Sequence, residues 1–326
     1  MRVVVFGGGS WGTAFARRLA DRGHAVTLAC RDAEQALAIA RSHRNPRYLS
    51  DVELGDVAAV PIGEAPLDAA DLVVAALPSR AFVDVVGSLP GSGPLLSLTK
   101  GLDPASGERL STLVGRRPVA VLSGPTFAEE IAAGLPAAAV IASEDATLAA
   151  ELQEAINSPT FRVYVNADLT GVELCGAAKN VIALAAGGVD GVRLGDNAKA
   201  ALITRGLAEM ARLGEACGAR AETFAGLAGM GDLMVSCWSR HGRNRRAGEL
   251  IACGASPDEA VAQIGTVVEG ITTAPLLREL ARRVGVEMPI TEGVCAVLEG
   301  QSLAELAAGL MGRRPTEEWR QRTPGE

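Results

Sequence analysis

The sequence predicts a chain in two parts, a doubly wound parallel α/β sheet followed by an all-α domain. In the first part, short apolar runs alternate with amphipathic stretches, which is typical of β–α–β units in a parallel sheet. After about residue 166 the strand-like runs stop, and helical stretches follow one another. We therefore place a boundary at residue 170 and expect domains at 1–170 and 171–326.

The first half begins with an apolar run that suits a strand buried on both faces of a sheet. A helix is expected next, at 11–22, where Trp11, Phe15 and Leu19 have helical spacing and Gly23 ends it. A second helix is expected at 33–41, with Leu37 and Ala40 facing inward, and a third at 147–156. The expected strands are 3–6, 25–29, 71–77, 95–98, 119–122, 138–141 and 161–165.

The second half carries clear helix-start signals. Ser256-Pro257-Asp258-Glu259 is a capping box with proline at the first helical position. Ser302-x-x-Glu305 is expected to open an amphipathic stretch whose apolar face holds Leu303, Leu306 and Leu310. From Pro315 onward we expect a polar, poorly ordered terminus. Further helices are expected at 169–186, 198–216 and 269–283.

The composition excludes several classes of protein. A net charge of −7 and a pI near 5.2 argue against a nucleic acid or an anionic membrane as partner. No apolar run approaches the length of a membrane span, and the first apolar stretch is too short for a signal peptide. The six cysteines are scattered, which indicates free thiols in a reducing cytoplasm and no metal site.

The basic residues are strongly biased, since 28 of the 31 are Arg and three are Lys. Lysine can give up a proton where arginine cannot, so each lysine raises a functional question. Lys199 lies on a predicted helix, and we assign it nothing beyond a surface charge.

A glycine-rich hexapeptide, Gly7 to Gly12, follows the first strand and opens the first helix. This is the context that the G-x-G-x-x-G fingerprint of a Rossmann-type dinucleotide-binding domain requires. Gly7 permits the tight turn, Gly9 lets a pyrophosphate approach the backbone, and Gly12 lets helix and strand pack closely. The helix start then offers N–H groups to the anion. The alternative is a glycine-rich turn without a ligand.

The residue after the second strand bears on which dinucleotide binds. Arg31 comes there, before Asp32, and a cation favours the 2′-phosphate of NADP(H) over NAD(H). Asp32 has two alternatives, to face the ribose or to pair with Arg31. We expect NADP(H) or NAD(H), with NADP(H) preferred.

Two later strands are also followed by polar residues. Lys100 lies where open α/β sheets bind ligands, and it either contacts a phosphate or substrate oxygen or is a surface lysine. In the segment 123–129, Thr126 and Glu129 either form a capping box or belong to a polar-ligand site.

Lys179 stands in a stretch of small and apolar residues. Desolvation there would lower the pKa of its ammonium towards neutrality, as a general acid–base group needs. The alternative is a lysine that extends to solvent. Asp232 is an acid that could orient or pair with Lys179. Arg243 to Arg246 form either an anion site at a helix start or a solvated run of charge.

Taken together, these segments resemble the bacterial-type NAD(P)-dependent glycerol-3-phosphate dehydrogenase family. The resemblance extends over nearly the whole chain in the same order. It is carried by residues 7–14, 100–101, 123–128, 178–180, 197–206, 229–233, 243–246 and 268–270.

The resemblance implies specific site residues. It implies cofactor contacts from Ser10, Trp11, Arg31, Lys100, Ala128, Arg243, Val267 and Glu269. It implies substrate contacts from Lys100, Gly124, Thr126, Asp232, Arg243 and Asn244, with Lys179 as proton acceptor and donor. Two departures stand out, because Gly242 replaces the usual serine and the position of Arg31 varies within the family.

The implied reaction is reversible hydride transfer between NAD(P)H and dihydroxyacetone phosphate, giving sn-glycerol 3-phosphate for phospholipid synthesis. One alternative is a dehydrogenase of another phosphorylated or carboxylated hydroxy acid, such as 6-phosphogluconate. Another is a non-catalytic NADPH-binding regulator, which would leave Lys179, Asp232 and the arginine cluster without a purpose. The assembly, with a homodimer among the options, stays open.

Overall fold

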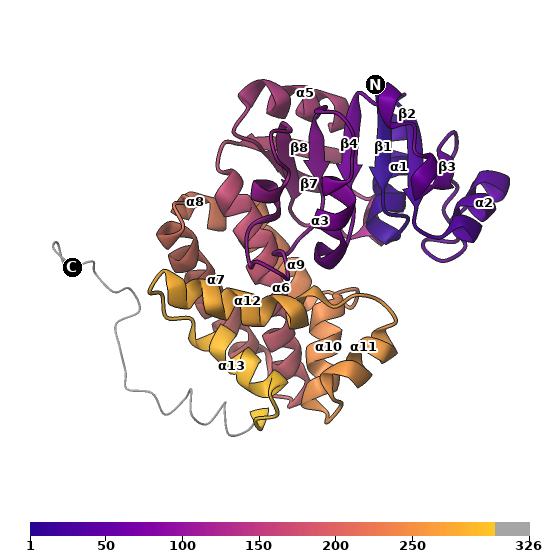
Figure 1. The fold of residues 1–326 in the computed structure, drawn as a ribbon. Helices are drawn as coiled ribbons and strands as arrows, with labels where there is room; N and C mark the ends of the chain where they lie inside the picture. The colour runs from indigo at the N-terminus through magenta and orange to yellow at the C-terminus, as the bar shows by residue number, and fades with distance from the viewer. Residues whose placement is uncertain (304–326) are drawn as a thin grey trace.

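The architecture is taken from a computed structural model, which describes residues 1–303 (Figure 1). A sheet with its helices forms one part, and a cluster of helices forms the other. The strands are β1 (Arg2–Phe6), β2 (Ala25–Cys30), β3 (Ala58–Pro61), β4 (Leu72–Ala75), β5 (Leu95–Ser97), β6 (Val119–Ser123), β7 (Ala137–Ala142) and β8 (Phe161–Asn166).

The eight strands form one sheet in the order β3-β2-β1-β4-β5-β6-β7-β8. The doubly wound α/β class is confirmed, with one difference from a wholly parallel sheet. Strand β7 runs antiparallel to β6, and β8 then pairs parallel with β7. β6 and β7 are joined through the short helix α4 (Ala128–Ala132), and this connection reverses the chain direction instead of crossing over. β3 was not predicted, and it lies at the edge of the sheet, half-buried.

Helices cover both faces of the sheet. One face packs on α1 (Ser10–Asp21) and α5 (Ala146–Ile156), with Phe15 and Leu152 in the apolar cluster. The other packs on α3 (Ser79–Gly87) and the 3-10 helix η3 (Leu110–Leu113). Helix α2 (Ala33–Ser42) buries Ala36 and Ile39, so the prediction that Leu37 and Ala40 face inward was wrong. Asp32 caps this helix, and its start places the inward stripe one position away.

The helical part is built around α6 (Leu169–Gly191), which is buried along almost its whole length. The expectation that no apolar stretch reaches the length of a membrane span was wrong for this helix, which alone among the described helices is long and apolar enough. However, 94% of its apolar window is buried inside the protein. It is therefore a core helix. The other helices are α7 (Asp196–Ala216), α8 (Ala221–Phe224), α9 (Asp232–Trp238), α10 (Arg243–Ala252), α11 (Pro257–Ile264), α12 (Glu269–Arg283) and α13 (Pro289–Leu298), with the π-helical turn η4 (Leu227–Gly231) before α9.

Two expected side-chain caps can be compared with the structure. The capping box of α11 is present, with Ser256 and Glu259 bonded reciprocally. The alternative that Thr126 and Glu129 form a capping box was wrong, because α4 begins at Ala128 and its N-cap residue, Phe127, makes no capping bond. The stretch opened by Ser302-x-x-Glu305 and the terminus from Pro315 lie outside the described residues.

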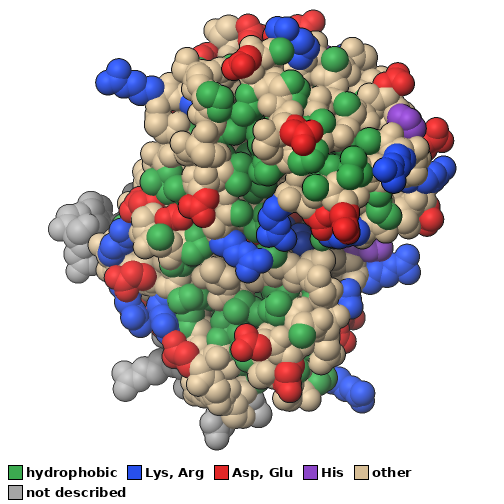
Figure 2. Space-filling view, turned by 45° about the vertical axis from the view of Figure 1, so that its right-hand side comes forward, with side chains coloured by type: hydrophobic (Ala, Val, Ile, Leu, Met, Phe, Trp, Pro, Cys, Tyr) green, Lys and Arg blue, Asp and Glu red, His purple; other side chains and the backbone are tan. Residues whose placement is uncertain are grey.

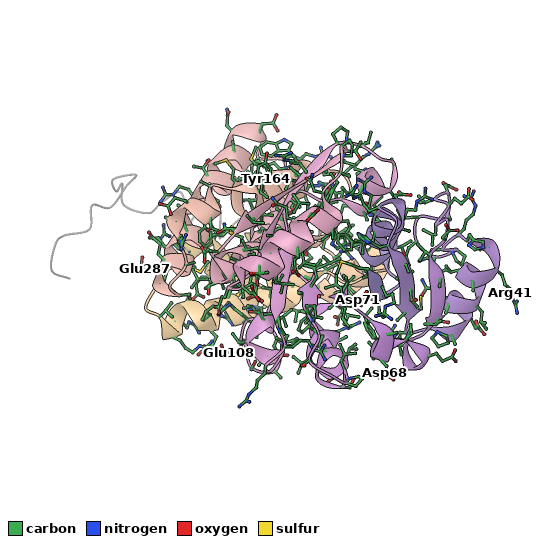
Figure 3. The ribbon with its side chains drawn as sticks, turned by 90° about the horizontal axis from the view of Figure 1, so that it is seen from above. Arg41, Asp68, Asp71, Glu108, Tyr164 and Glu287 are labelled. Atoms are coloured by element: carbon green, nitrogen blue, oxygen red, sulfur yellow. The ribbon has the colours of Figure 1, made fainter. Side chains whose placement is uncertain are left out.

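Polar contacts join the two parts of the chain. The buried carboxylate of Glu173 on α6 accepts hydrogen bonds from the backbone N–H and hydroxyl of Ser111 and from Arg109, 2.8 Å away. Glu108, labelled in Figure 3, lies 3.2 Å from Arg283 at the end of α12. These contacts hold the segment after Lys100 against the helices, and Lys100 is thereby placed beside α6.

Candidate active site

Three of the predicted site residues meet at one buried carboxylate. Asp232, the first residue of α9, accepts a hydrogen bond from Lys100 Nζ on Oδ2 at 2.7 Å. Its other oxygen, Oδ1, accepts one from Lys179 Nζ at 3.0 Å. Lys100 follows β5 and Lys179 lies in α6, so sheet and helices each contribute one member. The prediction that Asp232 pairs with Lys179 is confirmed.

This arrangement sets the electrostatics of the centre. Burial lowers the pKa of Lys179 to about 8; Asp232 opposes this shift, while Lys100 adds to it as a like charge. Burial by itself would raise the pKa of Asp232, but the two ammonium groups hold that pKa below its ordinary value. Lys179 is only 8% exposed, so the alternative of a lysine that extends to solvent was wrong.

The structure adds two polar residues that the sequence analysis did not single out. Ser236 lies one helical turn after Asp232, accepts a hydrogen bond from Lys179 at 2.8 Å and donates one to Asp232 at 3.3 Å. Asn180 donates to the carbonyl of Lys100 at 3.3 Å and accepts from Asn244 at 2.8 Å. The i, i+4 spacing from Asp232 to Ser236 was the available signal in the sequence.

The end of β6 lies beside Lys100. The ammonium of Lys100 donates to the carbonyl of Gly124 at 3.1 Å and to the hydroxyl of Thr126 at 3.4 Å. Gly124 has a φ of +134°, and an added Cβ would lie 3.1 Å from the backbone of Ala138. Glycine is therefore required at this turn.

Within the arginine cluster, Arg245 forms ion pairs inside the helical part. α10 begins at Arg243, as the helix-start prediction requires, but Arg245 is turned away to Asp190, 2.9 Å distant, and to Glu249. The expectation of one anion site made by the whole run was therefore wrong for Arg245. Asn244 faces the centre and accepts a hydrogen bond from the backbone of Gly270 at 2.9 Å.

The local backbone also explains Gly242. A Cβ at this position would lie 2.6 Å from the carbonyl oxygen of Ser236. The serine that the resemblance leads us to expect here does not fit this backbone without a shift of the segment that carries Ser236.

The glycine loop has the geometry that its spacing predicts. Gly7 has a φ of +113°, and a Cβ on it would lie 2.2 Å from the carbonyl oxygen of Ala76. A Cβ on Gly12 would lie 1.9 Å from the carbonyl oxygen of Gly7, whereas Gly9 faces open space. No side chain caps α1, so the N–H groups of Ser10 and Trp11 are available at the helix start. Nε1 of Trp11 is buried and has no hydrogen-bond partner within residues 1–303.

The remaining cofactor candidates lie around the same sheet edge. Arg31 is exposed at the end of β2, and Asp32 pairs with Arg47 at 2.6 Å, so the alternative that Asp32 pairs with Arg31 was wrong. Ala128 is buried at the start of α4 and Val267 is half-buried before α12. The carboxylate of Glu269 accepts from the backbone N–H of Ser79 at 3.0 Å and from its hydroxyl at 2.7 Å.

Lys199 differs most from its prediction. It is 5% exposed and pairs with Asp190 at 2.7 Å, so it is not a surface charge.

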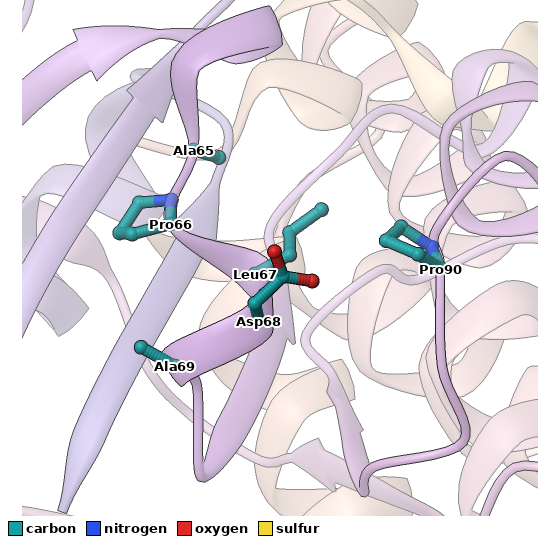
Figure 4. Close-up of a pocket in the computed structure, with 6 residues that line it drawn as sticks. All are labelled: Ala65, Pro66, Leu67, Asp68, Ala69 and Pro90. Carbon is teal, nitrogen blue, oxygen red and sulfur yellow. The ribbon is translucent and has the colours of Figure 1, made fainter.

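The surface around the site carries several cations. Figure 2 shows Lys and Arg side chains at the level where the two parts of the chain meet. The hollow drawn in Figure 4, between Pro90 and the segment 65–69, is lined by none of the candidate site residues. Within residues 1–303, no group of three or more His, Cys, Asp or Glu side chains is placed to hold a metal ion.

Comparison with known proteins gives the family. Residues 2–149 match the model of the NAD-dependent glycerol-3-phosphate dehydrogenase N-terminus, and residues 168–308 match that of its C-terminus. The chain belongs to the NAD-dependent glycerol-3-phosphate dehydrogenase family. A member from Nocardia farcinica, named glycerol-3-phosphate dehydrogenase (NAD(P)+), is 47% identical over 96% of this chain and 98% of its own.

Further relatives agree. A protein of the same name from Moorella thermoacetica is 45% identical over 97% of both chains. The crystal structure of glycerol-3-phosphate dehydrogenase from Coxiella burnetii superposes with a TM-score of 0.91 at 37% identity, covering 96% of this chain and 99% of that one. The resemblance inferred from the motifs is confirmed.

The residues of this chain fit the dinucleotide that the family name implies. Open space at Gly9 and unpaired backbone N–H groups at the start of α1 suit a pyrophosphate. The unpartnered Nε1 of Trp11 supplies a further donor beside them. The carboxyl ends of β1, β5 and β6 lie at one sheet edge, so this loop and the Lys100–Asp232–Lys179 centre face the same side.

Proposed function

We propose that the chain is an NAD(P)-dependent sn-glycerol-3-phosphate dehydrogenase that interconverts dihydroxyacetone phosphate and sn-glycerol 3-phosphate. The observation that carries this proposal is the carboxylate of Asp232, which lies between Lys100 and Lys179 at the nucleotide-binding edge of the sheet. A lysine with a pKa near 8, held by an acid, is suited to move a proton at neutral pH.

Substrate binding is assigned to the residues around this centre. Arg243 and Asn244, at the first turn of α10, bind the phosphate, because a helix N-terminus and a guanidinium both favour an anion. Lys100, Thr126 and Gly124 line the side towards β6 and hold the remaining oxygens.

Lys179 handles the proton. The nicotinamide, when bound, supplies or accepts the hydride at the C2 carbon of the substrate. In the reductive direction the Lys179 ammonium gives its proton to the C2 oxygen, and the product is the alcohol. In oxidation the neutral amine takes that proton back. Asp232 and Ser236 hold the ammonium at 3.0 and 2.8 Å and so orient it throughout.

The finer assignments belong to the same proposal. Arg31 favours NADP(H) through the 2′-phosphate. Residues 1–170 form the dinucleotide-binding domain and 171–326 the substrate domain. The enzyme acts in the cytoplasm, as a homodimer, and its product feeds glycerophospholipid synthesis. Light scattering on the purified chain tests the assembly.

The test of the activity is NAD(P)H oxidation with dihydroxyacetone phosphate, comparing wild type with Lys179→Ala. A substrate-dependent rate in the wild type and its loss in the variant are expected. Absence of a rate in the wild type, with oxidation of 6-phosphogluconate by NAD(P)+ instead, would reject the substrate assignment. Full activity in the variant would reject only the role of Lys179. The matched control is Arg282→Met, which removes an exposed ion pair on α12.

A further inference from the structure

Lys199 is a buried lysine that the reaction leaves without a task. Its ammonium donates to both oxygens of Asp190, at 2.9 and 2.7 Å, and lies 5.2 Å from the centre of the Trp238 ring. Desolvating an ion pair is unfavourable unless the geometry is good, and two short bonds with a cation–π contact provide that geometry. Arginine is used at most other basic positions of the chain, but here a compact ammonium is kept.

The same carboxylate also holds α10. Oδ2 of Asp190 accepts a hydrogen bond from Arg245 at 2.9 Å. Arg245 donates in addition to the carbonyl of Ser239, 3.2 Å away, at the end of α9. The Lys199–Asp190–Arg245 network therefore ties together α6, α7, α10 and the end of the helix that carries Asp232.

The network acts where helices touch backbone to backbone. A Cβ on Gly187 of α6 would lie 1.8 Å from the carbonyl oxygen of Arg245, and a Cβ on Gly248 of α10 would lie 1.9 Å from that of Leu184. The backbones of the two helices are therefore in direct contact beside Arg245. The bond from Arg245 to Asp190 adds a side-chain restraint at the first turn of α10.

We propose that Lys199 and Asp190 are positioning residues, which through Arg245 fix the first turn of α10 so that Arg243 and Asn244 hold the substrate phosphate. This inference rests on the proposed function. Arg243 and Asn244 immediately precede Arg245, so a shift of Arg245 moves them first. Lys179 lies elsewhere on α6, and its partners Asp232 and Ser236 precede the end of α9 that the network contacts, so proton transfer should change less than phosphate binding.

The experiment compares Lys199→Met, the near-isosteric Asp190→Asn and the double variant with wild type. The expected result is a KM for dihydroxyacetone phosphate raised about tenfold or more, with kcat changed less than about threefold. The inhibition constant of inorganic phosphate, competing with substrate, should weaken in parallel. The Kd for NADPH, measured by fluorescence, should weaken less than the phosphate constant, because of the residues moved only Arg243 is also expected to contact the cofactor. The double variant should equal the single ones, because residues that act as a unit are not additive.

The controls separate this role from general destabilisation. Arg282→Met removes an exposed ion pair of the helical part and should leave both constants unchanged. If Lys199→Met does not fold, Asp190→Asn carries the same comparison, and thermal unfolding with added inorganic phosphate gives phosphate affinity without turnover. Unchanged KM and phosphate affinity, or a fall in kcat alone, would overturn the inference. A wild type that does not reduce dihydroxyacetone phosphate would overturn the proposed function. The role of the Lys199–Asp190–Arg245 network would then be tested by the phosphate affinity of the variants compared with that of the wild type.

Discussion

The pH dependence of the reductive reaction provides a direct test of the Lys100–Asp232–Lys179 centre. Lys179 must be protonated to give its proton, and burial lowers its pKa to about 8. The value of kcat/KM for reduction should therefore fall as the pH rises through about 8. Replacement of Asp232 by Asn removes the negative charge and keeps the shape.

The size of the change follows from the distances. Lys179 Nζ lies 3.0 Å from Asp232 Oδ1. Opposite unit charges at that separation attract by roughly 5 kcal/mol at an effective dielectric constant near 20. One pKa unit corresponds to about 1.4 kcal/mol, so loss of even a third of this attraction in Asp232→Asn should lower the pKa of Lys179 by about one unit. Lys100→Met removes a like charge and should raise it.

The assay is the pH profile of kcat/KM in wild type, Asp232→Asn and Lys100→Met, because this ratio reports on the free enzyme. Both variants will have lower activity, so the midpoint of the descending limb is compared and not its height. We expect the limb to move to lower pH in Asp232→Asn and to higher pH in Lys100→Met. Lys179→Ala should lack the limb.

A limb that stays in place, or that moves in the same direction in both variants, would refute this reasoning. It would mean that the titrating group is not a lysine whose charge is balanced between Asp232 and Lys100.

Three further predictions concern stability, steric fit and cofactor choice. Burial raises the pKa of Glu209 to about 7, although the hydrogen bond from the N–H of Ile290 opposes this shift. The contribution of protonated Glu209 to the free energy of unfolding is therefore full below about pH 4.5 and is lost as the pH rises through about 7. In urea unfolding, Glu209→Gln should remove up to about 3 kcal/mol of the change in unfolding free energy between pH 4.5 and pH 7. An unchanged dependence of the unfolding free energy on pH would contradict the assignment. Gly242→Ser should cost about 1–3 kcal/mol and lower the Tm, because its Cβ meets the carbonyl of Ser236; a lower substrate KM with an unchanged Tm would argue otherwise. Arg31→Ala should raise the KM for NADPH about fivefold and leave that for NADH unchanged, and equal changes for both would remove Arg31 from cofactor selection.

Local patterns in the sequence were sufficient for the main features of the fold and the nucleotide loop. The spacing of Gly7, Gly9 and Gly12 after an apolar run predicts a nucleotide-binding turn, and the structure confirms the need for glycine at Gly7 and Gly12 and the open space at Gly9. The capping box of α11 is equally local. The small, apolar surroundings of Lys179 in the sequence indicated a buried lysine with a lowered pKa. Each of these depends on residues a few positions apart.

Long-range packing decided the rest. The face of α2 that is buried depends on which of its residues pack against the sheet, so Leu37 was misplaced. The reversal of β7 depends on how the chain leaves β6. The sequence offered no way to see that Glu269 meets Ser79, because the two are 190 positions apart.

The lysines show the same division most clearly. Their rarity in an arginine-rich chain is visible in the sequence, and it singled out Lys100, Lys179 and Lys199. Only the tertiary structure shows that Asp232 joins Lys100 to Lys179, and that Lys199 lies buried on Asp190. The physical reason is that charge and side-chain type are properties of a residue. Burial and pairing, which set a pKa or fix a helix, depend on which distant surfaces come together when the chain folds.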